Sequence, residues 1–118
     1  MEESVNELRA RCIRVFESSV RKTEKAFVRM SMNNQSTTTI TKRLVALKIG
    51  LAVLNDTLSQ QSYRYSSEEL LTSRDILNSM LPSMRKILST SKDGSPQRTL
   101  LERRIQAFEL VIKILKTN

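Results

Sequence analysis

Helix-breaking residues are almost absent from this chain, and this scarcity limits its fold more than any other feature. Only two Gly and two Pro occur among its 118 residues. Proteins built from sheets need turn residues between their strands far more often than this. We therefore expect an all-α fold of long helices. The length corresponds to a single domain over residues 1–118.

Four segments carry apolar residues at steps of three and four, the spacing of one face of a helix. We expect helices at about 3–32, 40–61, 67–90 and 96–116. Pro82 falls within the third segment, where it removes one backbone hydrogen bond, but the apolar spacing continues across it without a shift. The pattern predicts one helix kinked at Pro82 rather than two short helices.

Local signals mark where the later helices begin. Thr38 or Thr39 is suited to cap the second helix, because a threonine side chain accepts a hydrogen bond from a free N–H of the first turn. Ser66 followed by Glu69 matches the capping box expected before the third helix. Pro96 follows a serine, and a proline at the first helical position loses no hydrogen bond. The linkers are short, so we expect an antiparallel up-down four-helix bundle.

The most apolar stretch is residues 42–54, KRLVALKIGLAVL. Its run from Leu44 to Leu54 is 11 residues long, whereas a membrane span needs about 20 apolar residues. Large apolar side chains repeat here with the 4-3-4-3-4 spacing of a helix seam. They are Ile40, Leu44, Leu47, Leu51, Leu54 and Leu58. The stretch is therefore interpreted as the inner helix of the bundle, without a transmembrane segment.

A second apolar row on the same helix consists of Val45, Ile49 and Val53. A helix in a bundle touches two neighbours, and a wide apolar surface is the ordinary consequence. The row is also a candidate partner-binding site, where a second copy of the chain would pack as a homodimer or another protein would dock an amphipathic helix.

The chain is strongly basic, with a net charge of +8 at pH 7. Five cations lie on one side of the first expected helix, along about 27 Å of its rise. They are Arg11, Arg14, Arg21, Lys25 and Arg29. Such a row is suited to phosphates or to an acidic protein, although it is also typical of a solvated helix face. Aromatic residues that could stack on bases are limited to Tyr63 and Tyr65 around Arg64, in a linker.

The sequence contains few of the side chains that catalytic sites ordinarily use. There is no His, and Cys12 is the single cysteine. The usual general base, a thiolate metal cluster and an internal disulfide are therefore excluded. We expect no enzyme activity, no cofactor and no metal site. The missing disulfides and the charged opening, MEESVNELRARC, favour a reducing intracellular compartment, the cytoplasm or alternatively the nucleus.

One short stretch, RTLLERRIQAF at residues 98–108, resembles the last helix of BAG domains, helical modules that bind the nucleotide-binding domain of a chaperone. In that family an Arg and a Gln eight residues apart face the chaperone, and Arg98 and Gln106 have this spacing. The acidic residue expected at the end of the preceding helix is missing from MLPSMRKIL. The chain is therefore not assigned to the family.

Together, these features predict a non-enzymatic protein–protein interaction module, such as an adaptor, a chaperone-like subunit or an assembly subunit. Partners would dock on helix faces, with the apolar row as anchor and the cations of the first helix steering association. The alternative is a basic nucleic-acid-binding protein that uses the same cations.

Overall fold

The computed structural model describes residues 3–55 and 65–117, and all of its regular structure is helical. The helices are α1 (Val5–Met32), α2 (Thr38–Asn55), α4 (Ser67–Thr90) and α5 (Pro96–Thr117). The predicted all-α four-helix fold is confirmed. The predicted extension of the second helix over 56–61, which includes Leu58, lies outside the described residues, as do Tyr63 and Arg64.

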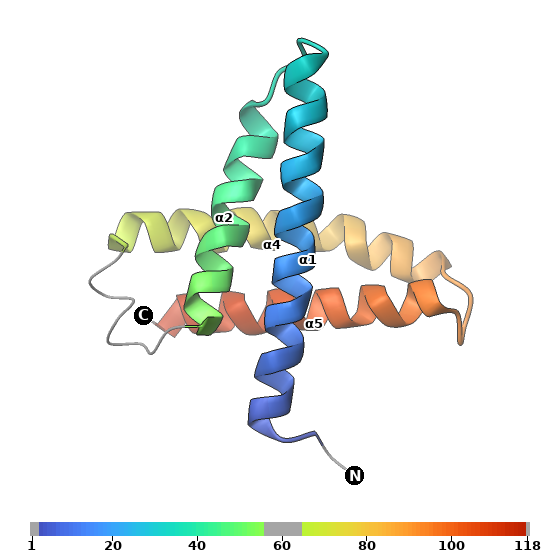
Figure 1. Cartoon of the computed structure of the whole chain (residues 1–118). Helices are drawn as coiled ribbons and strands as arrows, with labels where there is room; N and C mark the ends of the chain where they lie inside the picture. The colour runs from blue at the N-terminus through green and yellow to red at the C-terminus, as the bar shows by residue number, and fades with distance from the viewer. Residues whose placement is uncertain (1–2, 56–64, 118) are drawn as a thin grey trace.

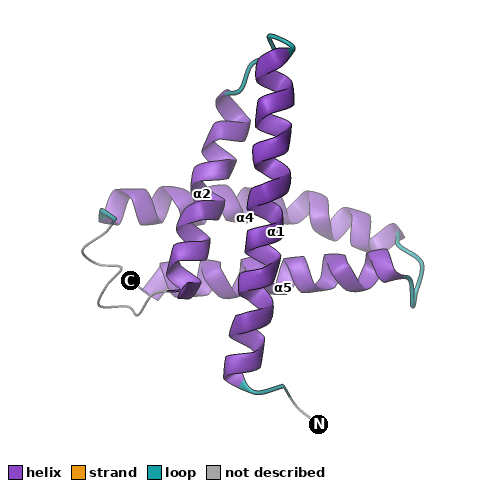
Figure 2. Ribbon diagram, viewed as in Figure 1, coloured by secondary structure: helices purple, strands orange, loops and turns teal. Residues whose placement is uncertain are grey.

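Two antiparallel helix pairs form the fold, and they cross as two layers. In Figure 1, α1 and α2 stand upright in front, and α4 and α5 lie across behind them. Each pair is joined by a short loop at one end (Figure 2). The described part of the molecule measures 40 × 38 × 20 Å, and its short dimension matches two helix layers spaced about 8–10 Å apart. The layers therefore share only the middle of each helix pair.

Two of the predicted helix starts are confirmed by their hydrogen bonds. The Ser66 hydroxyl accepts from the Glu69 N–H at 3.0 Å, and the Ser66 N–H donates to the Glu69 carboxylate at 3.1 Å, which completes the capping box. The Ser95 hydroxyl accepts from the Arg98 N–H at 3.1 Å, and α5 begins at Pro96 as its first residue. These local signals fix the starts of both helices of the second pair.

Helix α2 begins two residues earlier than the predicted start at residue 40. The Thr37 carbonyl accepts the Thr41 N–H at 2.9 Å, and the helix begins at Thr38. Thr38 and Thr39 therefore lie inside the first turn and are not caps. Because consecutive threonines offer the same capping side chain, the sequence does not distinguish among them.

Pro82 lies inside α4, which continues as one helix from Ser67 to Thr90. The proline is exposed, and the residue before it, Leu81, is 3% exposed in the core. Figure 1 shows the helix axis changing direction past its middle. The single kinked helix predicted from the unbroken apolar spacing is confirmed.

The core lies where the two layers cross. Phe16 of α1 and Phe108 of α5 are 0% and 1% exposed, and their ring centroids are 5.2 Å apart at a tilt of 34°. Tilted aromatic pairs at such distances add about 0.5–1.5 kcal/mol beyond the burial of their area. This pair joins the front layer to the back layer.

Helix α2 is buried on more than one side because it contacts α1, α4 and α5. Ile49 and Val53, two residues of the predicted apolar row, are each 3% exposed and belong to the core. Only Val45 of that row stays at the surface, with 50% exposure. The docking row predicted from the sequence is thus corrected. The neighbouring helices of the same chain cover most of it.

Gly50 allows α2 to approach Phe16 closely. A Cβ atom at this position would lie 2.5 Å from Cε2 of Phe16. The ring cannot move easily, because Phe16 is fully buried against Phe108. Gly50 is the small residue that makes this contact fit.

Replacing Gly50 by alanine should therefore destabilise the fold, although alanine is the better helix former by about 1 kcal/mol. Overpacking costs about 1–3 kcal/mol, and the rigid buried ring puts Gly50→Ala toward the upper end, so we expect a net loss approaching about 2 kcal/mol in urea unfolding followed by circular dichroism. In a Phe16→Leu background the same substitution should cost less, because the contacted ring is gone. A Gly50→Ala variant as stable as the natural chain would contradict this packing.

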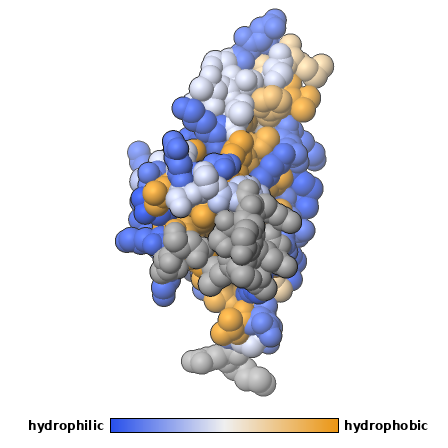
Figure 3. All heavy atoms as spheres, turned by 90° about the vertical axis from the view of Figure 1, so that its left-hand side faces the viewer, coloured by the Kyte–Doolittle hydropathy of each residue, from blue (hydrophilic) through white to orange (hydrophobic). Residues whose placement is uncertain are grey.

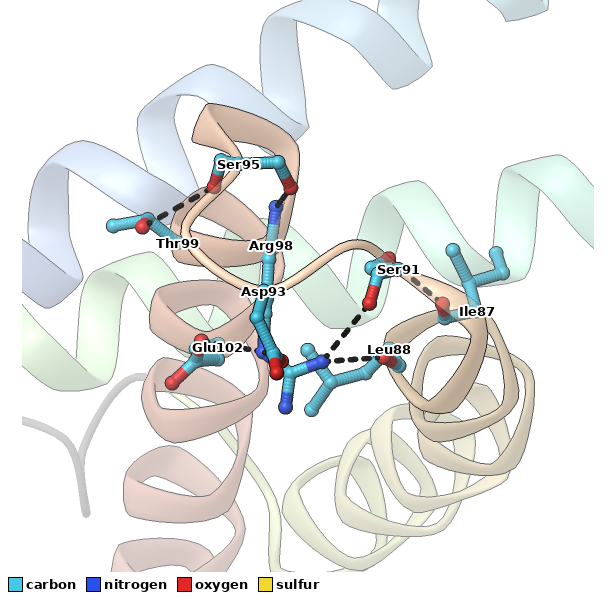
Figure 4. Close-up of polar contacts among 8 residues, drawn as sticks. All are labelled: Ile87, Leu88, Ser91, Asp93, Ser95, Arg98, Thr99 and Glu102. Atoms are coloured by element: carbon cyan, nitrogen blue, oxygen red, sulfur yellow. Dashed lines mark hydrogen bonds and ion pairs between the residues drawn. The ribbon is translucent and has the colours of Figure 1, made fainter.

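The loop between α4 and α5 is held by Arg98 (Figure 4). Its Nη1 donates to the carbonyls of Leu88 and Ser91, at 3.0 and 3.2 Å. Leu88 lies in the last turn of α4, where its carbonyl also accepts the Ser91 N–H at 3.1 Å, and Ser91 is the residue that follows the helix. Its Nε lies 3.6 Å from Asp93 and 3.4 Å from Glu102. Arg98 thereby adds charged hydrogen bonds to the carbonyls at the end of α4.

The carbonyl contacts of Arg98 should matter more than its ion pairs. Arg98→Gln should cost about 1–2 kcal/mol of unfolding free energy, because partly buried carbonyls lose a charged donor. Asp93 is 97% exposed in its ion pair, so Asp93→Asn should cost less than about 0.5 kcal/mol. Urea unfolding of both variants measures the difference, and equal losses would contradict it.

Candidate functional site

A cationic groove runs between α1 and α5, with a volume of about 210 Å³. We call it the α1–α5 groove. Its lining residues are Arg11, Arg14, Val15, Ser18, Lys22, Leu100, Arg103 and Arg104. Five of these eight are Arg or Lys, and none is acidic. The groove is thus a concentrated positive surface on a chain that is already basic.

Helix periodicity brings these side chains together. Arg11, Arg14 and Lys22 recur at multiples of three or four, so they share one face of α1. On α5, Arg104 lies four residues before Phe108 and next to the buried Ile105. An arginine beside the buried stripe faces the neighbouring helix and keeps its charged end near the surface. The packing of α1 against α5 therefore sets two rows of cations opposite each other.

Only two of the five predicted stripe residues line this groove, Arg11 and Arg14. Arg11 also pairs with Glu3 at 3.0 Å and donates a hydrogen bond to Oε1 of Gln106 on α5. Arg21, Lys25 and Arg29 are exposed on the same helix, outside the groove.

Sequence reasoning missed Arg103 and Arg104 because their role depends on which helix they face. The available signal was an arginine flanking the seam of the last helix, at Arg104. A cation in that position is common in helix pairs and gives no hint of its neighbour.

A second cavity, the crossing pocket, lies where all four helices meet and measures about 260 Å³. Its lining residues are Ser19, Lys22, Thr23, Arg43, Leu47, Ser79, Met80, Ser83, Met84, Arg104 and Phe108. Lys22 and Arg104 line both this pocket and the α1–α5 groove. The two cavities are therefore neighbours that share a positive wall.

A third groove of about 310 Å³ lies between α2 and α4, and Val45 and Ile49 line it together with Ile76. Lys42 and Glu69 lie in the same lining, so its charges are mixed. Figure 3 shows the side of the molecule with α2 and the start of α4, where hydrophobic residues appear as scattered patches among hydrophilic ones. This groove is what remains of the predicted apolar row at the surface.

Metal and membrane sites can be assessed within residues 3–55 and 65–117. No three acidic or cysteine side chains come together there in a way that could hold a metal ion. Among the helices of the same ranges, none combines the length and apolar content needed to cross a bilayer.

Comparisons with known proteins give no family for this chain. No family model matches it, and neither the curated proteins nor the solved structures contain a match.

The two residues that resemble the BAG pair have partners within the chain. Arg98 binds the end of α4, and Gln106 accepts a hydrogen bond from Arg11.

Cys12 borders the basic face and is 1% exposed as a free thiol. Burial raises the pKa of this thiol above its ordinary value of 9.0, Arg11 opposes the shift and Glu3 adds to it. The folded state therefore holds the thiol proton more tightly than the unfolded state does. The resulting stability is present below pH 9.0 and is lost as the pH rises through the folded-state pKa.

We expect the stability difference between the natural chain and a Cys12→Ala variant to change in alkaline solution. Above pH 9.0 the natural chain should lose stability faster, because only its unfolded state gains a readily ionised thiol. Every other side chain is common to the two proteins, so the comparison isolates the effect of Cys12. Urea unfolding at a series of pH values gives the two curves. Parallel curves would contradict the assignment.

Proposed function

We propose that this protein is a non-enzymatic protein–protein interaction module that binds an acidic, amphipathic segment of a partner along the α1–α5 groove. The observation that carries the proposal is a groove whose lining holds five cations, no acidic residue and the apolar side chains of Val15 and Leu100. An adaptor, a chaperone-like subunit or an assembly subunit would use such a groove.

The groove cations have few intramolecular partners. Arg14, Lys22, Arg103 and Arg104 form no ion pair within residues 3–55 and 65–117. Arg11, the exception, pairs with Glu3. Like charges held close together repel one another, and a bound anionic segment would relieve that repulsion. It would also accelerate association through electrostatic attraction.

The apolar members of the groove favour a protein partner. Leu100 is 62% exposed and Val15 is partly buried, and both lie among the arginines. A helix with acidic residues on one side and aliphatic residues at steps of three and four would contact both kinds of side chain. Buried apolar contact at the centre with charges at the rim is typical of protein interfaces.

Nucleic acid is the second candidate, favoured by Arg21, Lys25 and Arg29, which continue the row of cations along α1. Single-stranded nucleic acid usually also needs exposed aromatic rings for stacking. Phe16 and Phe108 are unsuited to that role, because both are buried in the core. The protein-binding role accounts for the exposed Leu100, which phosphate contacts leave unexplained.

A reducing intracellular setting, the cytoplasm or the nucleus, fits this proposal. The single cysteine, Cys12, is buried as a free thiol. A partner that is a second copy of the chain would appear as a dimer in light scattering after size-exclusion chromatography.

Two charge-reversal variants with the same net charge test the groove. The first carries Arg14→Glu and Arg103→Glu inside it, and the matched control carries Arg21→Glu and Arg29→Glu outside it. The probe is a labelled acidic helical peptide with leucines at steps of three and four, measured by fluorescence anisotropy. We expect the groove variant to lose about tenfold or more in affinity and the control only a few-fold, since rim charges act weakly.

Retention on heparin and binding to duplex DNA distinguish the nucleic-acid-binding alternative from the protein-binding proposal. For a nucleic-acid-binding protein, a plot of the logarithm of the DNA association constant against the logarithm of salt concentration has a slope of nearly −1 per neutralised phosphate. A steep slope of this kind would favour nucleic acid as the partner. Equal loss of DNA binding in both variants, without any peptide binding, would contradict the protein-binding proposal.

A further inference from the structure

We infer that the crossing pocket is a binding site for a phosphate group, either inorganic phosphate or a phosphate monoester. This site is separate from the groove proposed for a partner, although the two share Lys22 and Arg104. It carries its own cation, Arg43, and its own buried hydroxyl, Ser19. The inference therefore goes beyond the proposed function and can hold without it.

Three cations from three different helices line the pocket. Lys22 belongs to α1, Arg43 to α2 and Arg104 to α5. No acidic residue is among the lining residues, and none of the three cations forms an ion pair in the part of the chain that the structure describes. Arg104 is also partly buried. Lys22 and Arg43 are exposed, so only Arg104 gives up part of its hydration, and a bound anion would supply the charged partner that it lacks.

Ser19 gives a second and independent indication. It is 8% exposed, and its Oγ is buried with no hydrogen-bond partner. Buried hydroxyls nearly always have a partner, so an orphan at the wall of a cavity points to a missing ligand atom. Serine has three staggered rotamers, and rotation about χ1 can turn the hydroxyl toward an occupant of the pocket.

The donors match phosphate better than a carboxylate. Besides the three cations, hydroxyl groups of Thr23 and Ser83 line the pocket with Ser19. A phosphate monoester carries a charge of about −1.5 to −2 and three acceptor oxygens, whereas a carboxylate has one charge and two oxygens. The volume of about 260 Å³ lies just below the ~300–1,000 Å³ of most small-molecule sites. A compact charged group suits this space.

The pocket floor is apolar. Leu47 and Phe108 are each 1% exposed and line the pocket together with Met84. An apolar floor lowers the local dielectric and strengthens the attraction between the cations and an anion. These three apolar side chains also offer no carboxylate or other anion that could pair with the cations in place of a ligand.

Titration of the full chain with inorganic phosphate tests the site, with sodium chloride and acetate at matched ionic strength as references. Thermal unfolding and amide NMR shifts are the two readouts. We expect phosphate to raise the melting temperature more than either reference, and to shift the amides around Ser19, Arg43 and Ser83 with saturation. Equal responses to phosphate and chloride would overturn the inference.

Two variants with the same net charge distinguish phosphate binding in the pocket from a general effect of the protein's charge. Arg43→Gln removes a pocket cation, and Arg103→Gln removes an exposed cation that lies only in the α1–α5 groove, with the same change in net charge. We expect Arg43→Gln to weaken phosphate binding about tenfold, as for the loss of one charged hydrogen bond. Arg103→Gln should leave phosphate binding within about twofold, because exposed charges away from the ligand act weakly. Equal weakening by both would overturn the site.

Ser19→Ala gives a signature that a merely structural serine would not. Removing an orphan hydroxyl should raise the melting temperature of the phosphate-free protein, and removing a ligand contact should weaken phosphate binding. Both changes together support the site. If Ser19→Ala binds phosphate as tightly as the natural chain, Ser19 does not contact the ligand, and the second indication for the site is lost. If Arg43→Gln also binds phosphate as tightly as the natural chain, the inference is overturned.

The source of the phosphate follows from a comparison of two peptides. A short acidic peptide is measured with a serine and with a phosphoserine at the same position. Tighter binding of the phosphorylated form, lost in Arg43→Gln, identifies a phosphorylated protein segment as the source. Equal binding of the two peptides, with inorganic phosphate still saturating the pocket, identifies a small phosphate compound.

Discussion

The contact among Phe16, Gly50 and Phe108 is the point on which the rest of the structure depends. It joins α1 to α2 through a close approach at Gly50, and the front layer to the back layer through two tilted rings in contact. Because the layers cross, they share only a small central area, and much of each helix lies outside it. Val5 and Met32 at the two ends of α1 are 82% and 79% exposed. Side chains at the crossing therefore have to be fitted closely, whereas residues near the helix ends are less constrained.

Local features of this fold were predictable from the sequence, and the crossing was not. The capping box at Ser66 and the start of α5 at Pro96 depend on residues within a few positions of each other, so the sequence contains the whole interaction. An apolar stripe tells which face of a helix is buried, but it does not tell which helix covers that face. This is why Ile49 and Val53 were open to two interpretations. The contacts of α2 with three other helices account for their burial.

In the candidate site, too, features within one helix were predictable from the sequence, and contacts between helices were not. Arg11 and Arg14 were found from spacing within one helix, because periodicity alone puts them on one face. Arg103 and Arg104 join them only when α5 packs against α1, and Arg43 joins the crossing pocket only when α2 lies over the back layer. A site assembled from three helices has no compact motif in the sequence. Its chemistry could be anticipated from a net charge of +8, but its position could not.

Close packing and polarity meet at Ser19. Helices that cross at short range need small residues, and Gly50, Ala46 and Ala107 supply them without burying a polar side-chain atom. Ser19 fills a similar space but leaves a hydroxyl without a partner, which costs about 1–3 kcal/mol relative to a satisfied group. Stability alone would favour alanine at this position, since alanine is also the better helix former. The same pocket wall carries Lys22 and Arg104, cations that form no ion pair within the described ranges. An orphan hydroxyl and two cations without an ion pair thus lie at one cavity, and one bound anion would give all three a partner.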